Sequence, residues 1–260
     1  MIICFSGTGN TLAVARRLSE ATGEHLYRID SWQPKALPEL AEGERLGFVF
    51  PVYGWDMPRV VKDFLKKVAL PKTSADTYIY MVCTCGDDIG HTDRLFQKAL
   101  ARHGLQATSL WSVLMPDTYI ALPGFDIDNS EETADKLREA SRRVDAIAES
   151  VRLKKTQVVD VKNGAFAWTK THVLGWFFDR FLVKEKKFRL SPKCIGCGKC
   201  AQACPLDNIT IGADQKPKWQ GHCTGCLACF HTCPVHAIDY GRFTKNKGQY
   251  RPKEFLPHTK

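Results

Sequence analysis

Eight of the eleven cysteines fall in the segment 194–233, in two runs with the same spacing. The first run reads Cys-x2-Cys-x2-Cys-x3-Cys-Pro, and the second repeats it 29 residues later. Four thiolates are the ligand set of an iron–sulfur cubane. In paired runs of this kind, the fourth cysteine reaches across to the other cluster. The repeat therefore predicts two [4Fe–4S] clusters.

Each predicted cluster takes three ligands from one run and the fourth from the other. The two ligand sets are Cys194, Cys197, Cys200 and Cys233, and Cys223, Cys226, Cys229 and Cys204. Two four-cysteine zinc sites are the alternative. The duplicated three-plus-one spacing and the proline after each run favour clusters over zinc. The same offset also maps Ile209 onto Ile238, which indicates an internal duplication.

The residues before the cysteine runs alternate short apolar stretches with helical patterns. Strands are predicted at Met1–Phe5, Leu26–Ile29, Leu46–Pro51, Tyr78–Thr84 and Ala107–Val113. Helices are predicted near Asn10–Thr22, Pro58–Val68, His91–His103 and Glu131–Lys154. This alternation is typical of an α/β domain with a parallel sheet between helices. Ligands of such sheets bind at the carboxyl ends of the strands, so the loops after the strands are the places to search.

The loop after the first predicted strand reads Ser6-Gly7-Thr8-Gly9-Asn10-Thr11 and opens into a helix. Free backbone N–H groups at a helix N-terminus, with hydroxyl and amide side chains beside them, suit a phosphate group. The loop has no Walker A lysine, and Leu12 stands where a dinucleotide fingerprint needs its third glycine. A phosphate monoester is the expected ligand, and a plain glycine-rich turn is the alternative.

Two later loops should lie at the same end of the sheet. The first reads Pro51-Val52-Tyr53-Gly54-Trp55, and the second contains Thr84-Cys85-Gly86. The rings of Tyr53 and Trp55 could stack on a flat heterocycle, although ordinary packing is the alternative. Cys85 is interpreted as a packed thiol, with a reactive thiol as the alternative.

With these three loops, residues 1–155 resemble a flavodoxin. The resemblance implies a doubly wound five-stranded parallel sheet of order 2-1-3-4-5, with FMN as the cofactor. It places the loop Ser6–Thr11 at the FMN phosphate and the other two loops at the isoalloxazine. Many flavodoxins carry an aromatic residue in the third loop. Cys85 stands there in this chain, so Tyr119 is the expected substitute.

Three carboxylates accompany the two isoalloxazine loops. Asp56 follows the first loop, and Asp87 and Asp88 follow the second. If they lie close to the flavin ring, their negative charge should lower the flavin potential.

The rest of the chain divides by composition and resemblance. Residues 187–243 resemble a bacterial-type two-cluster ferredoxin, which implies a small α+β domain. Residues 156–186 are expected to form a helical linker, and residues 244–260 a basic tail. An apolar stripe in the linker favours a helix packed between the two domains. A helix that docks on a partner or on a membrane surface is the alternative.

Charge is concentrated in the last 77 residues. The segment 184–260 holds 14 basic and 5 acidic side chains, which accounts for the whole net charge of +9. This basicity predicts redox partner proteins with an acidic docking surface. Nucleic acid is not expected, because no groove-reading helix or stacking platform accompanies the charge. The longest apolar run is too short for a transmembrane segment, and no signal peptide is recognised, so a cytoplasmic location is expected.

The combination resembles proteins in which a flavodoxin-like domain is fused to a two-cluster ferredoxin. It implies electron transfer between the two clusters and FMN, which would couple one-electron donors to a partner reductase. The alternative is a flavin-dependent oxidoreductase that itself reduces a small molecule of the quinone or nitro type. No catalytic acid–base pair can be named, so an enzymatic role is left open.

Overall fold

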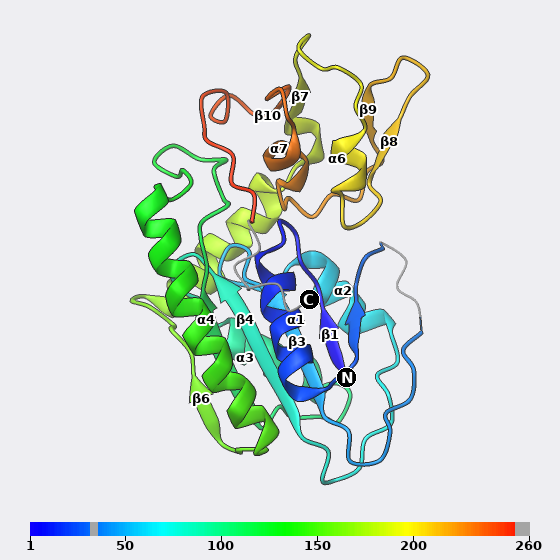
Figure 1. Cartoon of the computed structure of the whole chain (residues 1–260), viewed down its shortest axis with the longest axis vertical. Coiled ribbons are helices and arrows are strands. Elements are labelled where there is room, and N and C mark those ends of the chain that lie inside the picture. Colours follow the sequence, from blue (N-terminus) through cyan, green and yellow to red (C-terminus); the bar gives the residue numbers. More distant parts are fainter. Residues whose placement is uncertain (32–35, 253–260) are drawn as a thin grey trace.

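The computed structural model describes residues 1–31 and 36–252. Figure 1 shows a large lobe, in which helices flank a sheet, and a smaller lobe seated over one end of that sheet. Of the expected basic tail, residues 253–260 lie outside the described residues.

One parallel sheet of six strands forms the centre of the large lobe, in the order β2-β1-β3-β4-β5-β6. The strands are β1 (Ile2–Cys4), β2 (Leu26–Arg28), β3 (Leu46–Pro51), β4 (Ile79–Cys85), β5 (Ser109–Leu114) and β6 (Val158–Asp160). The central strands β3 and β4 are buried almost throughout, as parallel strands covered on both faces are. The predicted α/β class and the order 2-1-3-4-5 of the first five strands are confirmed.

The sixth strand corrects the prediction of five. β6 lies within residues 156–186, the range expected to be a helical linker, and pairs in parallel with β5. It has three residues, and Val159 is exposed at this edge of the sheet. Such a strand buries little apolar surface, so it leaves no clear hydrophobic pattern in the sequence.

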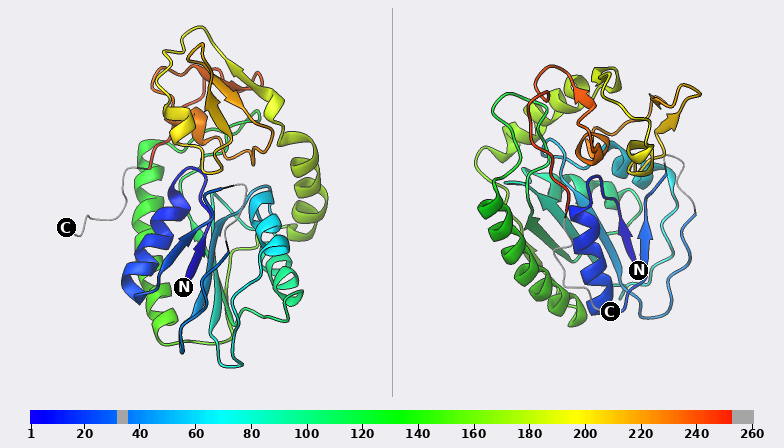
Figure 2. Two further views of the ribbon diagram at one scale, coloured as in Figure 1. Left: turned by 90° about the vertical axis from the view of Figure 1, so that its right-hand side faces the viewer. Right: turned by 45° about the horizontal axis from the view of Figure 1, so that its top comes forward.

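Four helices cover the two faces of the sheet (Figure 2). They are α1 (Asn10–Thr22), α2 (Arg59–Lys67), α3 (Thr92–Ala101) and α4 (Ser130–Arg152). Val14 of α1 and Val144 of α4 belong to one buried cluster with Ile2 of the sheet. Phe64 of α2 and Phe96 of α3 belong to the cluster on the other face. Apolar residues at helical spacing therefore bind each helix to the sheet.

The small lobe repeats one structural unit. Its elements are β7 (Phe188–Leu190), α6 (Lys199–Gln202), β8 (Ile209–Ile211), β9 (Pro217–Trp219), α7 (Ala228–Thr232) and β10 (Ile238–Tyr240). α6 with β8 and α7 with β10 start at the same 29-residue offset as the cysteine runs. β10 pairs antiparallel with β7, and β8 with β9. The internal duplication in the sequence is thus repeated in the fold.

A helix joins the two lobes. It starts as α5 (Ala167–Thr169) and continues through the wider π-helical turns η1 (Lys170–Gly175) and η2 (Phe178–Leu182). We call residues 167–182 the linker helix. The single turn η3 (Glu185–Lys187) then leads into β7. Within the described ranges, the structure has no helix of the length and apolarity that a membrane span requires.

Candidate functional site

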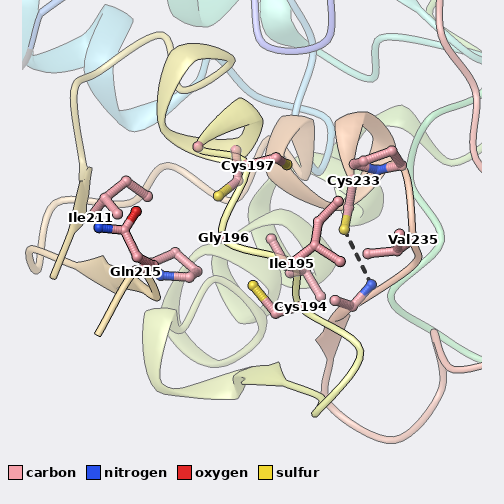
Figure 3. A pocket seen from close by; sticks show the side chains of 14 residues that line it. Cys194, Ile195, Gly196, Cys197, Ile211, Gln215, Cys233 and Val235 are labelled. Atoms are coloured by element: carbon pink, nitrogen blue, oxygen red, sulfur yellow. Dashed lines mark hydrogen bonds between the residues drawn. The ribbon is translucent and has the colours of Figure 1, made fainter. Parts of the chain in front are cut away.

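Four cysteines from the two runs line one small cavity at the outer end of the small lobe. They are Cys194, Cys197, Cys200 and Cys233, the set predicted to hold one cluster. Figure 3 shows the side chains of Cys194, Cys197 and Cys233 around this space, with Ile195 and Val235 beside them. The backbone N–H of Ala237 donates to Cys233 Sγ at 3.1 Å. We call this set the outer cysteines.

The second predicted set lies on the side that faces the large lobe. Burial, with a contribution from Cys223 and Cys204, raises the pKa of Cys226, and burial raises that of Cys223 to about 11. Backbone N–H groups donate to two of the sulfur atoms, Asn208 to Cys204 and Gly225 to Cys223, both at 3.3 Å. We call Cys204, Cys223, Cys226 and Cys229 the inner cysteines.

The neutral thiols of such a buried set become good ligands only where a metal centre stabilises the thiolate. Among the described residues, no three His, Cys, Asp or Glu side chains surround a point suited to a single metal ion. In a cubane, each thiolate binds a different iron atom, so the four ligands need not converge on one point. The donor sets, all sulfur with backbone N–H groups nearby, fit [4Fe–4S] clusters in their chemistry.

The turns between the first two cysteines of each run need glycine. Gly196 has φ +70° and Gly225 has φ +76°, both in the left-handed region. A Cβ on Gly225 would lie 3.1 Å from a methyl carbon of Val183, the residue that follows the linker helix. The left-handed backbone at both glycines allows a tight turn between the cysteines. At Gly225 the missing side chain also allows the loop to lie close to Val183.

The predicted phosphate loop forms a cradle at the start of α1. Ser6 Oγ accepts the N–H of Leu12 at 3.1 Å, and Thr11 Oγ1 lies 2.7 Å from Thr84 Oγ1. Among the described residues, the backbone N–H groups of residues 7–11 donate to no protein acceptor. A cavity of about 630 Å³ opens beside the loop, lined by residues 6–9, Arg28 and residues 202–205 of the small lobe. Unpaired backbone donors at a helix start suit a phosphate.

The first predicted isoalloxazine loop, residues 51–55, lies partly at the junction of the lobes. A Cβ on Gly7 would come within 2.2 Å of Tyr53 Oη and 2.6 Å of Cys226 Cβ. The phosphate loop, the predicted isoalloxazine loop and an inner cysteine therefore meet at one point. Trp55 is held differently, because its carbonyl accepts the hydroxyl of Thr171 at 3.1 Å and its ring lies 5.8 Å from Lys170 Nζ.

The remaining predicted flavin-loop residues come together above β3 and β4. Val52 donates its N–H to the carbonyl of Thr84 at 2.8 Å, which joins the first isoalloxazine loop to the second. Gly86 lies so close to Asp117 that any Cβ there would overlap the carboxylate. The Tyr119 ring is 5.3 Å from that of Phe178, which also lies against Gly54.

Phe178 is the contact that sequence reasoning missed at this site. In the sequence, Phe178 is one of several large apolar residues that form the apolar stripe in the linker. Nothing in the local pattern separates it from the neighbouring phenylalanines. Only the docking of the linker helix selects Phe178 for the space between Gly54 and Tyr119.

The three carboxylates near the loops each have a lysine partner. Asp56 lies 2.7 Å from Lys62 Nζ and Asp87 lies 3.0 Å from Lys162 Nζ, while Asp88 pairs with Lys170. Hydrogen bonding to Lys162 lowers the pKa of Asp87. The lysine partners offset the negative charge of these carboxylates, so their effect on the flavin potential should be small, contrary to the expectation from the sequence.

Cys85 should resist alkylation in the folded protein. Its side chain is buried, and burial together with the nearby Asp88 raises the pKa of the thiol to about 12. Only the thiolate attacks an alkylating agent, and little thiolate exists at pH about 8. Iodoacetamide treatment followed by peptide mass spectrometry should find Cys85 unmodified in the native chain and modified in the urea-unfolded chain. Rapid native labelling would instead favour the reactive-thiol alternative.

The segment after the small lobe returns to the phosphate loop. Tyr250 Oη donates to Asn10 Oδ1 at 3.1 Å, and a Cβ on Gly9 would lie 2.9 Å from Pro252. His231 of α7 lies between the lobes, with Nε2 2.9 Å from the carbonyl of Thr118 and Nδ1 accepting the N–H of Tyr250. These contacts hold the small lobe over the carboxyl ends of the strands, where ligands of such sheets bind.

The residues at this end of the sheet fit FMN in their chemistry. Within the part of the chain that the structure describes, the predicted phosphate loop offers unpaired backbone donors and holds no carboxylate of its own, while Asp30 and Asp207 line the cavity beside it. Gly7 and Gly9 allow Tyr53, Cys226 and Pro252 to approach the loop closely. Tyr53, Trp55 and Tyr119 supply aromatic rings around the predicted isoalloxazine loops.

The comparisons with known proteins bear chiefly on the small lobe. Residues 190–240 match the family described as a 4Fe-4S dicluster domain. The chain therefore carries an iron–sulfur cluster-binding domain after its N-terminal α/β domain. Among solved structures, an NAD(P)H:quinone oxidoreductase from Methanothermobacter marburgensis is similar with 13% identity and a TM-score of 0.37. That match covers 58% of this chain and 94% of the other. No curated protein matches the sequence.

Proposed function

We propose that this protein relays electrons between two [4Fe–4S] clusters and FMN, and so couples one-electron donors to a partner reductase. The observation that carries the proposal is the meeting of Gly7, Tyr53 and Cys226 at the lobe junction. It sets an inner cysteine directly against two of the three loops proposed for FMN. Because electron tunnelling weakens steeply with distance, adjacent centres exchange electrons fastest.

In this proposed relay, the outer cysteines hold one cluster and the inner cysteines hold the other. The FMN site is formed by Ser6, Gly7, Thr8, Gly9, Asn10, Thr11, Pro51, Val52, Tyr53, Gly54, Trp55, Thr84, Cys85, Gly86 and Tyr119. When bound, FMN supplies a centre that stores one or two electrons, whereas each cluster passes one. The chain positions the centres and shields them from water.

The two clusters would have different positions in the relay. Cys197 and Ile195 are exposed, so the cavity of the outer cysteines opens to solvent beside them. Cys229 is buried and Cys226 is partly buried, on the side toward the large lobe. We infer that the outer cluster exchanges electrons with the protein partner and the inner cluster exchanges them with FMN. Exposed Lys193 and Lys199 beside the outer cysteines suit a partner with an acidic surface.

Rapid mixing of the reconstituted chain with reduced methyl viologen, under anaerobic conditions, tests the relay. Cys197→Ala should remove the outer cluster and slow FMN reduction about tenfold. Cys4→Ala, at a buried cysteine of β1 outside both sets, should leave the rate unchanged. An unaltered rate in Cys197→Ala would refute the proposed order of centres. Turnover of a quinone or nitro compound at a catalytic rate without any partner protein would favour the oxidoreductase alternative.

A further inference from the structure

The linker helix presents its apolar side chains to solvent. Phe166, just before the helix, is 82% exposed, and Trp168 and Trp176 are each 61% exposed. The whole set, which we call the apolar face, is Phe166, Trp168, Val173, Leu174, Trp176, Phe177 and Phe181. Figure 2 shows the helix, in yellow-green, along the margin of the molecule between the lobes. An apolar stripe of this kind usually faces a protein core.

The inner side of the same helix carries Thr171 and Gly175, together with Phe178, which lies between Gly54 and Tyr119. The hydroxyl of Thr171 accepts the N–H of His91 at 2.8 Å and donates to the carbonyl of Trp55 at 3.1 Å. A Cβ on Gly175 would lie 2.5 Å from the carbonyl oxygen of Gly54, so only glycine allows this approach. These contacts fix the rotation of the helix. Turning it to bury Trp176 would break both hydrogen bonds of Thr171 and move Gly175 out of its close contact.

The charges beside the apolar face are cationic. The Arg180 guanidinium lies 5.8 Å from the ring centre of Phe181, and Lys187 Nζ donates to the carbonyl of Phe181 at 3.1 Å. The two carboxylates of this region are engaged elsewhere. Asp179 pairs with Arg59 and Lys62, and Glu185 accepts from Asn208 and Gly221.

The basic surface continues onto the neighbouring helices. A cavity of about 230 Å³ between α2 and α3 is lined by Lys66, Lys98 and Arg102, and by Lys62, which pairs with Asp56 at the same cavity. Lys62 lies 3.7 Å from Asp179 of the linker helix, so this cavity borders the apolar face. The combined surface is aromatic at its centre and positive at its edges.

We propose that this surface binds an anionic lipid bilayer, with the linker helix lying in the plane of the headgroups. Tryptophan and phenylalanine on one side, with lysine and arginine at the margin, match the lipid interface in both polarity and charge. A second copy of the chain fits less well. In a two-fold dimer, the same patch would face itself and bring Arg180 and Lys186 toward like charges. This proposal does not depend on the cofactors of the relay.

Cosedimentation of the full-length reconstituted protein with vesicles tests the proposal. Vesicles of phosphatidylglycerol and phosphatidylcholine should retain the protein at low salt, and pure phosphatidylcholine vesicles should retain much less. Trp168→Ser with Trp176→Ser should lower the partition coefficient at least about tenfold. Leu153→Ser is the matched control, because Leu153 is equally exposed after α4, and it should leave binding unchanged.

Charge reversal separates the electrostatic part from the apolar part. Arg180→Glu should weaken binding to anionic vesicles and reduce its salt dependence. Arg142→Glu on the exposed side of α4 should have little effect. Absence of binding to anionic vesicles at low salt would overturn the proposal. A dimer in sedimentation velocity that Trp176→Ser dissociates would also overturn it, because the apolar face would then cover a second copy.

Discussion

Replacing Cys226 with alanine should halve the iron content of the reconstituted protein, from about eight to about four atoms per chain. Cys226 belongs to the inner cysteines, is partly buried, and lies against Gly7 of the predicted phosphate loop. Removing one of four thiolates leaves an incomplete ligand set. The exposed iron corner is then lost with its cluster, whereas the outer cysteines keep theirs. Iron and sulfide analysis, followed by electron paramagnetic resonance of the reduced protein, measures the result.

The same variant should also disconnect the two lobes electronically. With the inner cluster gone, an electron on the outer cluster has no adjacent centre at the junction. Cys4→Ala is the control, since Cys4 is a buried cysteine of β1 outside both cysteine sets. Its iron content should stay at about eight. Full iron content in Cys226→Ala would show that Cys226 is not a ligand, and equal loss in both variants would point to general misfolding.

The second large effect is expected at Gly7. In Gly7→Ala, the new methyl group would lie 2.2 Å from Tyr53 Oη and 2.6 Å from Cys226 Cβ. Such distances require the small lobe or the aromatic loop to move outward. We expect about tenfold slower electron transfer between cluster and FMN, because a shift of about 1 Å at a reacting centre is costly. Weaker FMN retention should accompany it, measured by equilibrium dialysis.

Gly23→Ala separates this effect from general loss of stability. Gly23 ends α1 with φ +72°, and its Cβ would meet no atom within 4 Å. Alanine there should lower the unfolding free energy by about 1 kcal/mol through backbone strain alone. Electron transfer should stay at the wild-type rate. If Gly7→Ala transferred electrons as fast as Gly23→Ala, the junction would not be the site of exchange.

Local sequence patterns predicted much of the fold of the large lobe. Four helices and five strands of the large lobe lie within a few residues of their predicted positions. Helices and strands can each be predicted from the spacing of apolar residues along a short stretch of sequence. β6 was missed because a three-residue exposed edge strand has no such period. Its place beside β5 depends on backbone hydrogen bonds from a distant part of the chain.

The candidate site divides in the same way. Cysteine spacing predicted the two four-cysteine sets, and the glycine and hydroxyl residues after β1 predicted a phosphate cradle, because both are features of contiguous sequence. Only the tertiary structure decided that Cys226 meets Gly7, that Phe178 lies between Gly54 and Tyr119, and that lysines neutralise Asp56, Asp87 and Asp88. Tertiary packing also turned the apolar face of the linker helix outward, because Thr171 and Gly175 make the close polar contacts on its inner side. Each of these pairings joins residues from separate elements. These pairings depend on which surfaces of the folded elements fit together, and a local sequence pattern contains no information about that fit.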